Sequence, residues 1–391
     1  MSESLKPDFT RLKAALGDRL HFAAHARAPQ PDVARDAVLE CWDDSAREGG
    51  AWWRKVWGDV LPLARKNAAA VLRLADPELI AVAPTAHELL ARLLTCLPPG
   101  RDPRVLTTES EPRASARQIA RLEEDGARVE RLLVEPFGTF ADRLLSALKA
   151  GGHDLILLSQ VFPDSGLRVP DALLAAAAEL APRGALFVVD GGHAFGSVPT
   201  DFSRASARAF YLTGAGRGAQ SGEGLAFLAV PPGCPLRPAD TGGLADPDGL
   251  ARPVCAPAAY GTGGARFMGG AFDAAALYRW NAVCAWRRSR RLGPREIDAR
   301  VRDLQARFVR RLAERPRGPL DVERLVSMDL PALGHFLVLR HPEAERLAGF
   351  LGEELGVLVD HLGDRLRFGF GLHLDDGDVD ELFRRLDSVH A

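Results

Sequence analysis

The stretch Ala185–Gly192, ALFVVDGG, decides how this chain folds. Five small or apolar residues run up to a carboxylate, Asp190, and two glycines follow it. A short apolar run that ends in turn residues is typical of a strand covered on both faces. The stretch therefore predicts a central strand of a parallel sheet. Ligands of such sheets bind beyond the carboxyl ends of the strands, which is where Asp190 lies.

The sequence before this strand repeats one pattern of short apolar strands and amphipathic helices. The predicted strands are RVLTTES (104–110), VERLLVEP (129–136) and DLILLSQ (154–160), and the helices that accompany them are ASARQIARLEEDGA (114–127), FADRLLSALKAGG (140–152) and DALLAAAAELA (171–181). This alternation predicts an α/β fold with a mostly parallel sheet between two layers of helices. Further upstream, Thr85 precedes Glu88 by three residues, the spacing of a capping box at a helix start.

The sequence divides into three predicted parts. Residues 1–70 form a helical segment expected to pack with the small domain, 71–285 form a large α/β domain with the cleft, and 286–391 form a small C-terminal α+β domain. Pro and Gly are frequent between Pro231 and Phe267, which predicts an extended loop there.

Composition excludes several classes of function. The formal net charge of −2 on 391 residues leaves no field that would attract nucleic acid or an anionic membrane. The chain shows no export signal and no long apolar run, so we expect a cytoplasmic protein. The histidines show no metal-ligand spacing, so we expect no metal site. The cysteines lack a C-x-x-C pair and predict reduced thiols: Cys41, Cys96, Cys234, Cys255 and Cys284.

Lysine is rare in this chain. It occurs at five positions, and arginine makes up the other 45 basic residues. A GC-rich genome accounts for such a bias, yet its chemical consequence is definite. No lysine follows Lys149, so the C-terminal part of the chain has no side-chain primary amine.

Nine stretches of the sequence occur in an order that resembles one enzyme family. They are LHFAAHARAPQPDVARDAVLECWDD, DPELIAVAPTAHELLARLLTCLP, VLTTESEPRASARQ, LLSQVFPDSG, VVDGGHAFGSVPTDFS, FYLTGAGRGAQSGEGLAFLAVPPG, RPADTGG, RFMGGAFDAAALYRWNAV and RLRFGFGLHLDDGDVDEL. Together they resemble the class V (aminotransferase class V) branch of pyridoxal-phosphate (PLP) enzymes of fold type I, above all its kynureninase-like members. The resemblance covers nearly the whole chain. It implies a mostly parallel seven-stranded sheet, a small C-terminal α+β domain, and a dimer with its clefts at the interface.

The resemblance also assigns roles to individual residues. Thr85 and Ala86 correspond to the positions at the cofactor phosphate, where a helix N-terminus suits an anion. Asp190 corresponds to the carboxylate that faces the pyridine nitrogen, and His193 to a residue near the ring hydroxyl. Arg367 corresponds to the arginine that binds a substrate carboxylate.

The departures from the family pattern point away from its usual chemistry. Arg217 stands where the resemblance expects the lysine that forms the Schiff base, and a protonated arginine cannot form it. The segment Glu111–Ser115 lacks the aromatic or histidine expected to stack on the ring. Gly218 replaces an aromatic, and Ala271 replaces a threonine that reaches the neighbouring subunit's phosphate. Ordinary PLP chemistry is therefore not expected.

Two interpretations of the remaining polar residues stay open. Asp190 and His193 are either functional or relics of the fold, paired with each other or with Arg217. Arg217 either binds a phosphate or carboxylate or neutralises Asp190.

The sequence predicts an enzyme without a lysine aldimine, acting on a small amine, amino acid or carboxylate in specialised metabolism. His193, Asp190 and Arg217 are the candidate catalytic residues. Arg217 and Arg367 are the candidate substrate contacts, and together they predict an anionic substrate. The cofactor is either PLP or pyridoxamine phosphate (PMP), held noncovalently, or none. The alternative is a catalytically silent subunit that completes the site of a lysine-bearing paralogue, as a heterodimer rather than a homodimer.

Overall fold

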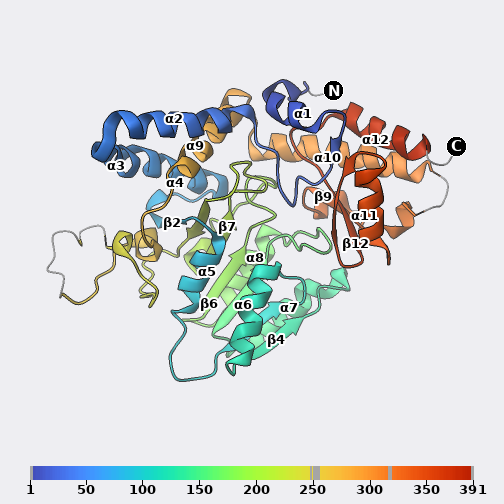
Figure 1. Ribbon diagram of the computed structural model, residues 1–391. Helices are drawn as coiled ribbons and strands as arrows, with labels where there is room; N and C mark the ends of the chain where they lie inside the picture. Colours follow the sequence, from blue (N-terminus) through green and yellow to red (C-terminus); the bar gives the residue numbers. More distant parts are fainter. Residues whose placement is uncertain (1–2, 247–248, 250–255, 316–318, 389–391) are drawn as a thin grey trace.

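The computed structural model describes residues 3–246, 249, 256–315 and 319–388. Cys255 and part of the predicted loop at 231–267 lie outside these residues. The chain builds a large α/β unit and a smaller C-terminal unit, and the N-terminal residues run across both (Figure 1). No helix among the described residues is long and apolar enough to cross a membrane.

The large unit is built on a seven-stranded sheet in the order β2-β8-β7-β6-β5-β3-β4. The strands are β2 (Ile80–Ala83), β3 (Arg104–Thr108), β4 (Arg128–Leu132), β5 (Leu155–Ser159), β6 (Leu186–Asp190), β7 (Ala209–Gly214) and β8 (Ala226–Ala229). β8 runs antiparallel to both of its neighbours, and the other pairings are parallel. The mostly parallel sheet predicted from the sequence is confirmed.

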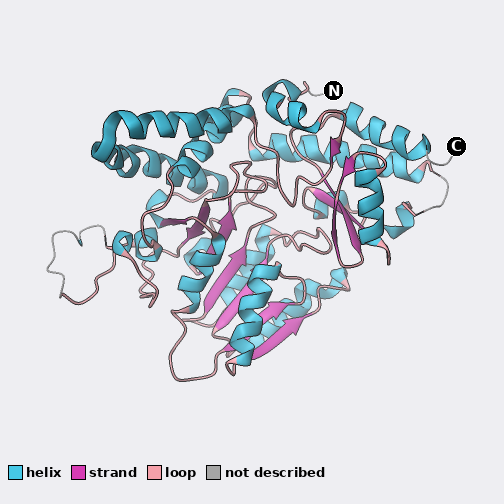
Figure 2. Ribbon diagram, viewed as in Figure 1, coloured by secondary structure: helices cyan, strands magenta, loops and turns pink. Residues whose placement is uncertain are grey.

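Helices cover both faces of this sheet (Figure 2). They are α4 (Leu61–Leu72), α5 (Ala86–Leu94), α6 (Arg113–Glu124), α7 (Phe140–Ala150), α8 (Asp171–Leu180) and α9 (Ala275–Ser289). The central strands β5 and β6 are buried on both faces, apart from the half-buried Asp190. The apolar run at 185–189 thus lies in the middle of the core, because helices cover both faces of its strand.

The small unit packs three helices on a three-stranded antiparallel sheet of order β11-β12-β9. Its elements are α10 (Pro294–Ala313), β9 (Phe336–Arg340), α11 (Ala344–Glu353), β10 (Val357–Leu358), β11 (Asp360–Leu362), β12 (Arg365–Gly369) and α12 (Asp376–Ser388). It has a core of its own, which includes Phe308, Phe368 and Phe383.

The predicted N-terminal segment divides between the two units. The elements here are α1 (Thr10–Leu16), β1 (Leu20–His21), α2 (Asp32–Glu48) and α3 (Trp52–Lys55). β1 pairs in parallel with β10, and Phe22 belongs to the core of the small unit. Cys41 on α2 belongs to the core of the large unit, and α2 lies along α9 (Figure 1). The segment 1–70 therefore joins the two units.

Candidate functional site

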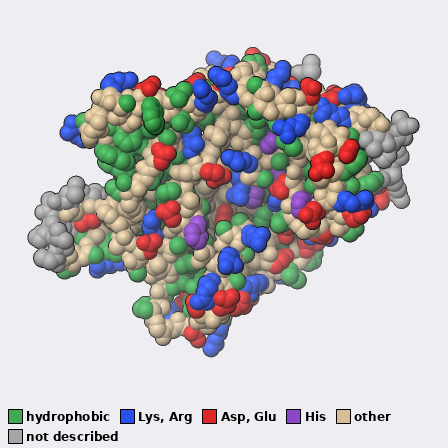
Figure 3. Space-filling view, viewed as in Figure 1, with side chains coloured by type: hydrophobic (Ala, Val, Ile, Leu, Met, Phe, Trp, Pro, Cys, Tyr) green, Lys and Arg blue, Asp and Glu red, His purple; other side chains and the backbone are tan. Residues whose placement is uncertain are grey.

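A cavity of about 190 Å³, called the cleft below, opens beyond the carboxyl ends of β6 and β7. Its polar lining residues are Thr85, His87, Ser115, Asp190, Arg217 and Glu223. Figure 3 shows acidic, basic and histidine side chains gathered near the middle of the face that it displays. The cleft lies where the position of Asp190 at a strand end predicted a ligand site.

The turn after β6 is fixed by close packing. A Cβ atom on Gly191 would lie 2.2 Å from the Tyr211 ring of the neighbouring strand, so only glycine fits there. The Tyr211 hydroxyl donates a hydrogen bond of 2.6 Å to Gln160 at the end of β5. The turn therefore has one conformation, which sets where Asp190 and His193 lie.

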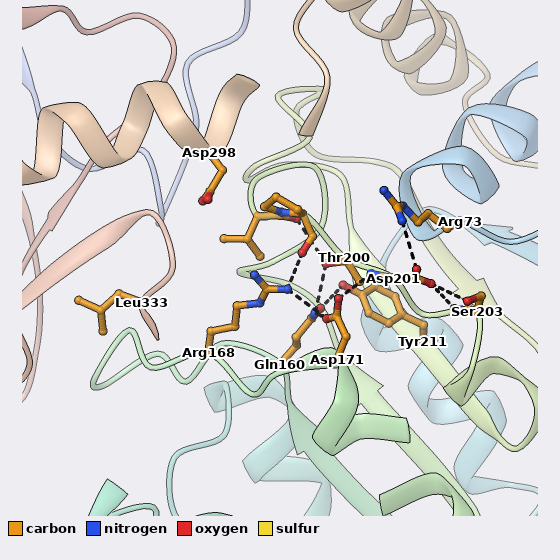
Figure 4. A network of polar contacts seen from close by, with 12 residues as sticks. Arg73, Gln160, Arg168, Asp171, Thr200, Asp201, Ser203, Tyr211, Asp298 and Leu333 are labelled. Atoms are coloured by element: carbon orange, nitrogen blue, oxygen red, sulfur yellow. Dashed lines mark hydrogen bonds and ion pairs between the residues drawn. The ribbon is translucent and has the colours of Figure 1, made fainter. Parts of the chain in front are cut away.

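Tyr211 belongs to a buried polar network that lies outside the cleft (Figure 4). The Gln160 amide donates to the Thr200 hydroxyl at 3.1 Å. Arg168 pairs with Asp171 at 3.1 Å and also donates to the carbonyl of Pro199. These residues hold the end of β5 and the middle of β7 to the loop around Thr200, so the network is a structural support behind the site.

Asp190 is satisfied by neutral donors rather than by a cation. Its Oδ1 accepts the Gly192 N–H at 2.8 Å, and its Oδ2 accepts the Ser115 hydroxyl at 3.1 Å. Burial raises the pKa of Asp190, although these bonds and the charge of Arg217 oppose the rise. Within the described residues it forms no ion pair. The carboxylate can therefore still accept a bond from a ligand.

Arg217 stands close to Asp190 without pairing with it. A Cβ atom built on Gly192 would lie 2.9 Å from Arg217 Nη1 and 3.0 Å from Asp190 Oδ1. The described residues supply the guanidinium of Arg217 with no hydrogen bond or ion pair, and its Nε is buried without a partner. Direct neutralisation of Asp190, one of the two predicted roles, is not seen.

The loop that carries Arg217 is held in a strained conformation. Gln220 has a φ of 57°, which is uncommon for a residue other than glycine. Its side chain donates to the carbonyl of Pro29 at 2.9 Å and accepts a 3.0 Å bond from Arg287 on α9. Such over-determined strain is typical of loops that position functional groups.

His193 does not line the cleft. It lines a second, smaller cavity, together with His25 and Arg217, and its ring tilts against Phe336 at 5.4 Å. Burial, followed by the charge of Arg217, holds the pKa of His193 well below its usual value, so the ring is neutral. The structure therefore places His193 and Asp190 in different cavities, and Arg217 is the one described residue that lines both.

Thr85 and Ala86 lie at the start of α5 and line the cleft. The Thr85 hydroxyl accepts the Glu88 N–H at 3.2 Å, so the N-cap bond of the predicted capping box is present. Glu223 also lines the cleft, and its Oε1 lies 2.6 Å from where a Cβ on Gly216 would be. A carboxylate therefore shares the cleft with this helix start.

Arg367 is committed to partners outside the cleft. Its guanidinium pairs with Asp360 and donates a 2.8 Å bond to the carbonyl of Pro163. The sequence predicts that Arg217 and Arg367 both contact an anionic substrate. The cleft instead holds Arg217 with Asp190 and Glu223. One guanidinium against two carboxylates does not favour a small dianion, so that basis for an anionic substrate is corrected.

Glu111 was not predicted as a site residue, because it falls in a segment that lacks the side chain expected to stack on the ring. It is buried, its Oε2 accepts the Ser159 hydroxyl at 2.6 Å, and its Oε1 accepts the Thr108 hydroxyl at 2.7 Å. Burial raises the pKa of Glu111 to about 8, with a smaller contribution from the charge of Asp190. Its place just after a strand, the rule that found Asp190, could have revealed it.

None of the five lysines lines the cleft, and all five lie among the described residues. Lys6 pairs with Asp375 and Lys55 with Asp44, while the remaining three are exposed: Lys13, Lys66 and Lys149. The cleft therefore contains no side-chain amine.

No protein-family model matches the sequence, and no curated protein matches it either. Solved structures do match over almost the whole chain. The cysteine desulfurase of Thermococcus onnurineus NA1 is 16% identical, with a TM-score of 0.81 over 100% of this chain and 98% of that chain. The cysteine desulfurase CsdA of Escherichia coli is 18% identical, with a TM-score of 0.80 over 98% and 97%.

A third match is a mutant of C-DES with glycine covalently linked to its PLP cofactor. It is 18% identical, with a TM-score of 0.81 over 99% of both chains. The chain therefore has the α/β fold of class V PLP enzymes, with a smaller C-terminal domain.

The cleft does not fit PLP in the way this fold usually holds it. Asp190 suits a protonated ring nitrogen, and the start of α5 suits a phosphate. However, no lysine lines the cleft, and Glu223 adds a second carboxylate to the same lining, which opposes the binding of a phosphate dianion. We derive no chemical step through this cofactor.

Proposed function

We propose that this chain is an enzyme that uses the class V scaffold without a lysine aldimine. Its substrate is a small molecule with both an amino and a carboxylate group. The observation that carries the proposal is the pair of opposite charges in the cleft, Asp190 and Arg217, which are close together and not paired with each other. A ligand with one charge of each sign satisfies both.

Each charged residue has a specific task in this proposal. The planar guanidinium of Arg217 binds the carboxylate, because two parallel N–H bonds match its two oxygens. Asp190 accepts a bond from the substrate ammonium, and Glu223 adds negative potential within the same cleft. Proton transfer falls to Asp190, because the neutral His193 lies in the other cavity. The kynureninase-like assignment within class V stays a prediction, as does a cofactor held noncovalently.

The first test concerns covalent cofactor chemistry. We expect borohydride treatment in the presence of PLP to leave no reduced adduct on any residue of the cleft, because no amine lines it. Peptide mass spectrometry would locate any adduct, and labelling of the exposed Lys66 or Lys149 serves as the positive control. A phosphopyridoxyl group on a cleft residue would contradict the proposal.

The second test concerns the ligand. We expect glycine or β-alanine to raise the melting temperature more than acetate, malonate or ethylamine at equal concentration, because only a zwitterion engages both charges. Arg217→Ala and Asp190→Asn should each abolish the rise, since each removes one of the two contacts. Arg183→Ala, an exposed arginine after α8, is the matched control and should keep it. A larger rise with malonate would contradict the proposal, because the cleft would then prefer a dianion to a zwitterion.

The silent-subunit alternative also has an observation in its favour. Large apolar side chains are exposed on α2, namely Val38, Leu39 and Trp42, and Trp42 is 74% exposed. Such a patch suits a partner chain. If no small molecule stabilises the protein but a lysine-bearing paralogue does, the partner function replaces the independent enzyme.

A further inference from the structure

Most of the polar side chains that line the smaller cavity, about 30 Å³ in volume, are those of arginine and histidine. We call it the histidine cavity. It lies where the N-terminal segment, the turn after β6, the loop after β7, α9 and the small domain meet. Its charged and titratable lining residues are Arg217, Arg287, His25, His193, His335 and His373. Among the described residues, no aspartate or glutamate lines it.

Neither arginine of this cavity has a carboxylate partner. Arg287 is buried, and it donates only to neutral acceptors: the carbonyls of Gly196 and Gly218 and the side-chain oxygen of Gln220. Arg217 forms no ion pair with any described residue. Buried charges in proteins are paired as a rule, because an isolated one is costly. Two unpaired guanidinium groups therefore leave a deficit of negative charge.

Several nitrogen atoms that lack partners add to this deficit. They are His193 Nδ1, His373 Nδ1, Arg287 Nε and Arg217 Nε, and each is buried without a hydrogen bond. The three residues other than Arg217 are less than 9% exposed. These atoms offer N–H donors, or ring nitrogens that become donors on protonation. The lining is therefore suited to a ligand that carries negative charge and accepts hydrogen bonds.

We propose that the histidine cavity binds one small monovalent anion of about the size of chloride. The volume is roughly twice the ~10–15 Å³ that a single water needs, so an ion of this size can be accommodated. The site differs from the cleft in its lining, and the inference does not depend on the proposed function.

Binding should strengthen as the pH falls. His193 is faced by Arg217, His25 and Arg367, which, after burial, hold it neutral. His25 lies 3.3 Å from Asp360 and is also faced by Arg217 and Arg367, and burial lowers its pKa to about 4. His335 is faced by Asp298, Arg302 and Arg287, and His373 by His21 and Lys6. An anion among them favours their protonated forms, so its binding takes up protons.

The decisive experiment locates the anion directly. A crystal of the whole protein soaked in sodium bromide should give an anomalous peak inside the histidine cavity, within contact of Arg217 or Arg287 and of at least one of the four histidines. A cavity that shows only water at full soak would overturn the proposal. This experiment needs no variant, so it decides even where a substitution prevents folding.

A solution experiment tests the charge and the pH dependence. Sodium chloride should raise the melting temperature more than sodium gluconate at equal ionic strength, and the apparent dissociation constant should fall by up to about tenfold per pH unit between pH 8 and 6 for each proton taken up. His193→Phe should weaken the response, whereas His87→Phe, an exposed residue of the cleft, should not. Equal responses to the two salts at both pH values would contradict the proposal.

Discussion

Asp360→Ala should lower the free energy of unfolding by about 3 kcal/mol, because it leaves the buried guanidinium of Arg367 without its carboxylate. Arg367 is 8% exposed and keeps only the carbonyl of Pro163. His25 also loses the partner that lies 3.3 Å away. Denaturant unfolding followed by circular dichroism measures the change. Asp364→Ala, which removes an exposed partner of Arg365, is the control and should cost less than about 1 kcal/mol.

The effect of Asp360→Ala should depend on pH in a defined direction. Burial alone would raise the pKa of Asp360, but hydrogen bonds from His25 and Arg367 and their charges lower it to about 2. A folded-state pKa below the unfolded value contributes stability at higher pH, and this contribution is lost as the pH falls through about 2. The gap between wild type and variant should therefore shrink between pH 4 and 2. A gap that stays constant would mean that lost packing causes the effect.

Glu111→Gln should stabilise the protein at alkaline pH by roughly 2 to 4 kcal/mol. Burial holds the pKa of Glu111 at about 8, above its unfolded value of about 4.3. The contribution of the protonated carboxyl is complete below pH 4.3 and is lost as the pH rises through about 8. Glutamine keeps the shape of the neutral acid and can still bond Thr108 and Ser159. Wild type and variant should therefore match at pH 4 and diverge by pH 9.

Thermal unfolding across that pH range measures the divergence. Glu109→Gln, an exposed residue two positions away, is the matched control and should show no gain on raising the pH. If Glu111→Gln destabilises the protein equally at every pH, the carboxylate is ionised in the folded state and its hydrogen bonds outweigh its burial.

Most of the fold can be predicted from patterns of residues that are close together in the sequence. The apolar run of β6 and the alternation of strands and helices before it define a parallel sheet, since a strand covered on both faces has few other solutions. The division of the N-terminal segment was not predictable in this way. The apolar residues of α2 and those in and just after β1 cannot be told apart from the sequence. Only tertiary packing assigns Cys41 to one core and Phe22 to the other.

The sequence predicts those site residues whose positions are set by a single strand or helix. Asp190 lies at a strand end and Thr85 at a helix start, and both positions are set by their own elements. The pairing of Arg367 with Asp360 depends on the register of the β11–β12 hairpin, and the bond of Arg367 to the carbonyl of Pro163 depends on how the small unit meets the large one. Spacing along the chain holds no information about such contacts. The bond between Glu111 and Ser159 is of the same kind, although the place of Glu111 just after β3 marks it as a candidate.

The position of Arg217 between the two cavities has a thermodynamic consequence. One guanidinium cannot give its full charge to two anions at once, so a carboxylate in the cleft and a halide in the histidine cavity would compete for it. Linkage makes such antagonism reciprocal: whatever factor the halide costs the carboxylate, the carboxylate costs the halide. The salt composition of the surroundings would then set the affinity of the cleft, through a single side chain and without any movement of the domains.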